Sequence, residues 1–105
     1  MDHELDELKR EFLVEAQEKV REMETALGTA DNRETLGRVA YLAHQLKGSG
    51  GSYGYQSISH DAAEIEQAVE GSSDNAADAA MRQKIHEHVL RLREEIDRRT
   101  RELSV

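Results

Sequence analysis

Residues 33–54 read RETLGRVAYLAHQLKGSGGSYG, an amphipathic helix pattern that runs into a cluster of glycines. Its apolar and small residues recur at steps of three and four, which places them on one face of a helix. That inward face is formed by Leu36, Val39, Ala43, Leu46 and Gly50. Each interior glycine costs a helix about 1 kcal/mol relative to alanine, so several of them beside His44 require a reason. We expect that reason to be access to the histidine.

The same periodicity predicts three further helices, each with one narrow apolar stripe. The stripe of the first comprises Leu5, Leu8, Phe12, Ala16, Val20, Met23 and Leu27. The stripe after the glycine cluster comprises Ile58, Ala62, Ile65 and Val69. The stripe of the last comprises Met81, Ile85, Val89, Leu92, Ile96 and Leu103.

Glycines and short polar residues mark where these helices begin and end. Gly28 is expected to stop the first helix, and Asp31 with Glu34 forms a capping-box pattern that starts the second. Gly54 suits the left-handed position just past the end of a helix. Ser57 or Ser59 is expected to cap the third helix.

Residues 71–75, GSSDN, interrupt the pattern before the last helix. No single stripe is wide enough to be buried alone, and short connections make neighbouring helices antiparallel. The sequence therefore predicts an all-α fold, an antiparallel up-down four-helix bundle, with residues 1–105 forming one domain. Because the four stripes can cover one another, we expect a monomer.

Composition excludes several classes of function. The chain has 105 residues, a formal net charge of −8, no cysteine and no proline. An acidic surface repels nucleic-acid phosphates and anionic membranes, no segment is apolar enough to cross a bilayer, and the absence of cysteine fits a reducing compartment. We expect a cytoplasmic protein that binds neither nucleic acid nor membrane. The arginines between residues 91 and 101 alternate with acidic residues and are interpreted as a solvated face.

His44 is expected to face solvent, because at 100° per residue it points about 140° away from the apolar face of its own helix. Four small residues stack along the same outer ridge, namely Gly37, Ala40, Gly48 and Gly51. A rigid partner surface could approach a histidine in such a lane without a steric clash.

The chemistry available to an exposed histidine is limited. Neutral imidazole has a nucleophilic nitrogen and can accept a phosphoryl group covalently. Lys47 lies three residues further on, beside the ring, and can offset the anionic phosphoryl oxygens. Phosphoryl transfer depends mainly on positioning and electrostatics, so a carrier needs little beyond a reachable nucleophile.

The run Ala43-His44-Gln45-Leu46-Lys47-Gly48-Ser49, with Gly54 ten residues after the histidine, resembles the signature of histidine-containing phosphotransfer (HPt) domains. These helical bundles carry phosphoryl groups between histidine and the aspartates of receiver domains in two-component phosphorelays. The resemblance implies that His44 is the phosphorylated residue, that Lys47 stabilises the phosphoryl group and that Gly48 opens the site.

The resemblance also implies the partners. These would be receiver domains of response regulators or hybrid kinases and a sensor histidine kinase, docking over a lane of Gly37, Ala40, Gln45 and Gly51. The chain would bind no cofactor, and the Mg²⁺ needed for transfer would belong to the receiver. No nucleotide-binding pattern is present, so we expect a phosphoryl carrier that cannot phosphorylate itself from ATP.

Two other functions remain open at this stage. One is a helical adaptor that is never phosphorylated, for which an acidic surface would be ordinary. The other is a metal-binding bundle, because His60 and Glu64 are four residues apart and could share one ion. His86 and His88 point to different sides of a helix, and the Glu-x-x-His pairs of di-iron bundles are missing. Tyr41, Tyr53 and Tyr55 are expected to pack or to contribute contacts at the edge of a docking surface.

Overall fold

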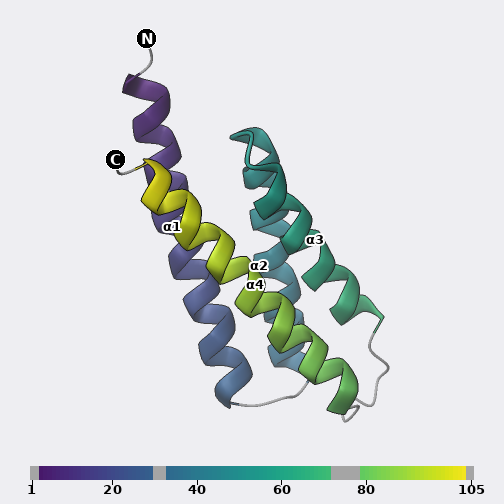
Figure 1. Cartoon of the computed structure of the whole chain (residues 1–105). Helices are drawn as coiled ribbons and strands as arrows, with labels where there is room; N and C mark the ends of the chain where they lie inside the picture. Colours follow the sequence, from purple (N-terminus) through teal and green to yellow (C-terminus); the bar gives the residue numbers. More distant parts are fainter. Residues whose placement is uncertain (1–2, 30–32, 72–78, 104–105) are drawn as a thin grey trace.

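The computed structural model describes residues 3–29, 33–71 and 79–103, which form four α-helices. They are α1 (His3–Thr29), α2 (Arg33–Ser52), α3 (Gln56–Glu70) and α4 (Ala79–Leu103). Successive helices run in opposite directions along one long axis (Figure 1). Helix α1 packs on α2 and α4, and α3 packs on the same two helices. The predicted antiparallel up-down four-helix bundle is confirmed.

The core lies where the four apolar stripes meet, as the periodicity predicted. Buried side chains come from every helix: Phe12, Leu13, Ala16, Val20, Met23, Leu27, Leu36, Val39, Leu42, Ala43, Leu46, Ile58, Ala62, Ile65, Ile85, Val89, Leu92 and Ile96. Val69, Met81 and Leu103 are only partly buried against this core. Leu5 and Leu8 were expected in the core but are exposed. They lie on the first turns of α1, which extend past the C-terminal end of α4 (Figure 1).

The turn between α2 and α3 sets how these two helices meet. Gly54 has a φ of 83°, so the predicted left-handed glycine is confirmed. Gly50 is buried, and a Cβ at this position would lie 3.2 Å from the backbone nitrogen of Ser59. Gly50 therefore faces inward, as predicted, and allows the start of α3 to approach α2 closely. The Tyr55 backbone N–H donates to the Gly50 carbonyl at 2.8 Å.

The predicted helix ends are right in part. Helix α1 continues to Thr29, so Gly28 lies inside its last turn. Asp31 and most of the interruption at 71–75 lie outside the described residues. Neither Ser57 nor Ser59 caps α3, which begins at Gln56 without a side-chain capping bond.

Both serines lie inside α3, past its N-cap residue Tyr55, and they tie the helix to its neighbours. The Ser59 hydroxyl donates to the Lys47 carbonyl on α2 at 2.8 Å. The Ser57 hydroxyl donates to the carboxylate of Glu95 on α4. The start of α3 is therefore fixed from two sides.

Glu95 is a buried carboxylate, with 4% of its surface exposed. The Arg99 guanidinium donates to it at 2.8 Å, and Arg98 is a second cationic partner. The side chains of Arg91, Arg93 and Arg98 are more than half exposed, as the interpretation of a solvated face requires. Arg99 is the partly buried one and joins α4 to Ser57. Burial alone raises the pKa of Glu95, but the hydrogen bonds from Ser57 and Arg99 outweigh it and hold the pKa below its ordinary value.

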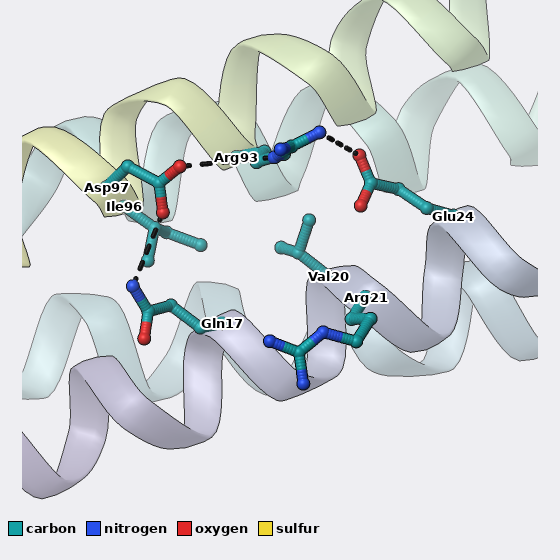
Figure 2. Close-up of a pocket in the computed structure, with 7 residues that line it drawn as sticks. All are labelled: Gln17, Val20, Arg21, Glu24, Arg93, Ile96 and Asp97. Carbon is teal, nitrogen blue, oxygen red and sulfur yellow. Dashed lines mark hydrogen bonds and ion pairs between the residues drawn. The ribbon is translucent and has the colours of Figure 1, made fainter.

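At the seam between α1 and α4, a row of hydrogen bonds and ion pairs lies over apolar side chains (Figure 2). Gln17 Nε2 donates to Asp97 at 3.3 Å, and Arg93 lies between Asp97 and Glu24, 3.3 Å from the Glu24 carboxylate. Val20 lines the same shallow groove of about 330 Å³. These contacts hold α1 against α4, on a seam that shares no residue with the surroundings of His44.

The buried carboxylate gives a test of the bundle. We expect Glu95→Gln to lower the free energy of unfolding by about 2 kcal/mol at neutral pH, since charge-assisted hydrogen bonds are lost at a buried site. Because the folded pKa is depressed, this stabilisation is present above the ordinary value of 4.5 and is lost as the pH falls through the folded pKa. The difference between parent and variant, measured by urea denaturation, should therefore shrink in acid.

Glu94→Gln is the matched control, because Glu94 is the exposed neighbour on the same helix. Its effect should stay within about 0.5 kcal/mol. Equal effects of the two substitutions would show that the Glu95 contacts do not stabilise the fold.

Candidate functional site

His44 lies on the outer face of α2, where the helical register directs it away from the core. Its neighbours Ala43 and Leu46 are buried, whereas 64% of the His44 side chain is exposed. The ring borders an open groove of about 620 Å³ between α1 and α2, which Lys19, Gln45 and other residues also line. The His44 side chain therefore points outward in the structure, as predicted.

One carboxylate on α3 contacts both predicted site residues of α2, His44 and Lys47. Glu66 Oε2 lies 2.9 Å from His44 Nδ1, and Glu66 Oε1 lies 2.8 Å from Lys47 Nζ. Only 17% of the Glu66 side chain is exposed. The three residues form a bridge from α2 to α3 with the carboxylate at its centre.

This bridge determines the proton arrangement of the imidazole. The hydrogen bond from Lys47 lowers the pKa of Glu66; desolvation opposes this, and the His44 contact adds to the lowering. The carboxylate is therefore ionised at neutral pH and can only accept hydrogen bonds. His44 Nδ1 must then carry a proton, which leaves the lone pair of a neutral ring on Nε2.

Sequence reasoning missed Glu66. It follows the buried Ile65 by one residue, which turns it toward one flank of α3. The pattern alone gives no indication of whether that flank faces α2 or α4. The handedness of the bundle and the short turn through Gly54 decide which helix Glu66 faces. No sequence motif reveals either of them.

Lys47 lies where the spacing predicted, beside His44, but its ammonium group is held by Glu66. Its side chain is 40% exposed, and its long flexible stem lets the charge be redirected at small cost. Lys47 and His44 are therefore linked through Glu66 and do not share a hydrogen bond with each other.

The predicted lane of small residues is open at some positions and closed at others. A Cβ at Gly37 or Gly48 would meet no atom within 4 Å, so both face open space. Ala40 is half-buried, and a Cβ at Gly51 would lie 3.7 Å from the Ser59 hydroxyl. Gly51 is partly exposed and lies where the outer ridge borders α3.

Gln45 lies on the α1 side of this surface and is half-buried. Its Nε2 donates to the Tyr41 hydroxyl at 3.0 Å. The predicted lane is thus open at Gly48. It is bounded by α3 on one side and by the polar side chain of Gln45 on the other.

The residues considered for a metal site lie elsewhere, on the α3–α4 side. His60 Nε2 is 2.8 Å from Glu64, while His88 Nδ1 is 3.6 Å and Arg91 3.8 Å from the same carboxylate. Among the residues that the structure describes, no three histidine or carboxylate side chains are arranged to hold a metal ion. Glu64 is instead a shared acceptor for neighbouring donors.

The bridge gives a direct prediction for the protons of the imidazole. At a pH where the ring is neutral, nitrogen NMR of His44 should show protonated Nδ1 and unprotonated Nε2. Glu66→Ala should remove this preference, because the acceptor of the Nδ1 proton is lost. Glu70→Ala, one turn further along α3, is the matched control and should leave the spectrum of His44 unchanged. A ring protonated on Nε2 in the parent chain would contradict the assignment.

Comparisons with known proteins place the chain in a family. No helix among the described residues combines the length and apolar character that crossing a membrane requires. No curated protein and no solved structure matches the chain. The family model described as "Hpt domain" matches residues 7–101, which include all of α2 and α3 and nearly all of α1 and α4. The chain therefore belongs to the Hpt domain family, the histidine phosphotransfer domains of phosphorelays.

Proposed function

We propose that this protein is a cytoplasmic phosphorelay intermediate that accepts a phosphoryl group on His44 and passes it to, or receives it from, the aspartate of a receiver domain. The observation that carries the proposal is the exposed His44 ring whose Nδ1 is held by the ionised Glu66, 2.9 Å away. Membership in the Hpt family supports the reaction class. The residue assignment rests on the site geometry.

The chemical step needs only groups that the two partners supply. His44 Nε2 attacks the phosphorus of the aspartyl phosphate, an N–P bond forms, and the P–O bond to the aspartate carboxylate breaks. The ring becomes a cation that keeps its proton on Nδ1, where the Glu66 carboxylate stabilises it. Transfer to a receiver is the reverse sequence.

The neighbouring residues have complementary roles in this proposal. Lys47 is near enough to turn from Glu66 toward the new phosphoryl oxygens and offset their charge. Gly48 faces open space beside the ring and leaves room for the receiver backbone. The Mg²⁺ belongs to the acidic pocket of the receiver, and the sensor kinase supplies the phosphoryl group upstream, so this chain acts as a carrier without an ATP site of its own.

Phosphotransfer to the purified chain tests this function. After incubation with a phosphorylated receiver domain and Mg²⁺, mass spectrometry at neutral pH should detect one acid-labile phosphoryl group. His44→Gln should abolish the gain. His60→Gln is a matched control, because His60 is also exposed and hydrogen-bonded to a glutamate, and it should be labelled like the parent. Labelling of His44→Gln would overturn the residue assignment, and no labelling by a panel of receivers would favour a helical adaptor.

Access at Gly48 gives a second test. We expect Gly48→Leu to fold normally, since its side chain enters open space and leucine is a better helix former than glycine. Transfer from the receiver should slow at least tenfold, because the added side chain stands between His44 and the partner. Gly28→Leu is the control, an equally open glycine in the last turn of α1. Normal transfer by Gly48→Leu would refute the steric role.

A further inference from the structure

Tyr41 differs from the other two tyrosines of the chain. Tyr53 and Tyr55 are partly buried and stack on Phe12, with ring centroids 5.2 and 5.8 Å away. Tyr41 is 53% exposed on α2 and is not part of the core. Packing accounts for two of the rings and leaves the third unexplained.

The Tyr41 side chain is nevertheless held in place from two directions. Gln45 donates to its hydroxyl at 3.0 Å, and the guanidinium carbon of Arg38 lies 5.5 Å from the ring centroid, a cation–π distance. Arg38 is itself paired with Glu22 on α1. An exposed aromatic ring that is already ordered loses little conformational entropy when a partner covers it.

The surface around Tyr41 is continuous with the surface around His44. Tyr41 lines two adjoining grooves on the α1–α2 seam, and Gln45 lines one of these together with the groove that His44 borders. The ring stands one helical turn from His44, where side chains three residues apart are about 5–6 Å from each other at Cβ.

This closeness constrains what can cover Tyr41, given the proposed function. His44 Nε2 must meet the aspartyl phosphate of the receiver, so the receiver face around that aspartate must cover the surroundings of His44. A standard interface buries about 800 Å² on each partner, a disc of about 16 Å radius. Tyr41 lies well inside such a disc, in the central region where tyrosine and arginine dominate binding energy.

We propose that Tyr41, held by Arg38 and Gln45, is the aromatic anchor that sets the affinity of this chain for its receiver domains, a statement that rests on the proposed function. The receiver would offer an apolar pocket beside its phosphorylated aspartate to take the ring. Glu15 and Glu18 are exposed along the groove next to Tyr41. The rim of that pocket would therefore carry lysine or arginine.

Single-turnover transfer from an excess of phosphorylated receiver domain tests the anchor; here kcat is the limiting transfer rate and KM is the receiver concentration that gives half of it. Tyr41→Ala should raise KM at least tenfold, the effect expected when a hot-spot residue is truncated, while the fall in kcat stays below twofold because the reacting atoms are untouched. Tyr41→Phe, which keeps the ring and loses the bond to Gln45, should raise KM less than alanine does. Leu90→Ala on α4 removes an equally exposed apolar side chain away from His44 and should leave KM unchanged.

Each result has one interpretation. Circular dichroism and thermal unfolding of Tyr41→Ala establish that the variant is folded, as its exposure leads us to expect. A KM of folded Tyr41→Ala within twofold of the parent value, or a loss confined to kcat, would overturn the anchor.

The unaltered chain is also treated with phosphoramidate, a small donor that needs no docking surface. A parent chain that neither phosphoramidate nor any receiver labels on His44 would instead refute the proposed function itself.

Discussion

The Glu66 carboxylate is the contact on which the site depends, because it holds His44 Nδ1 at 2.9 Å and Lys47 Nζ at 2.8 Å from a neighbouring helix. A surface histidine alone would rotate freely and carry its proton on either nitrogen. Here the ionised carboxylate orients the ring and retains the Nδ1 proton. The same contact keeps a cation beside the ring, ready to be redirected when negative charge arrives.

The bundle matters to the site mainly through the register of α2 against α3. Gly50 allows the helices to approach closely, and Ser59 bonds to the carbonyl of Lys47 at 2.8 Å. These contacts fix α3 so that Glu66, two turns further on, meets His44. The buried Glu95 secures the same end of α3 from α4. Core packing, a glycine and two serines thus position the Glu66 carboxylate.

The sequence was sufficient for the helices, the bundle and the exposed His44, because these follow from periodicity within one segment. Contacts between segments could not be predicted: Glu66 was missed, and Ser57 and Ser59 were expected to cap α3 although they lie inside it and bond to α4 and α2. The outer ridge is open at Gly48, as predicted, but borders α3 at Gly51, since spacing gives an angle around one helix but not the position of the next. Leu5 and Leu8 fit the stripe yet are exposed, because a stripe does not reveal where the neighbouring helix ends.

The central claim is that Glu66 selects the reactive nitrogen of His44. The most direct measurement is nitrogen and phosphorus NMR of the chain after phosphorylation by a receiver domain, which identifies the ring nitrogen bonded to phosphorus. The account predicts a phosphoryl group on Nε2, with the proton on Nδ1 retained and hydrogen-bonded to Glu66. A phosphoryl group on Nδ1 would contradict it, because that nitrogen could then no longer donate to the carboxylate.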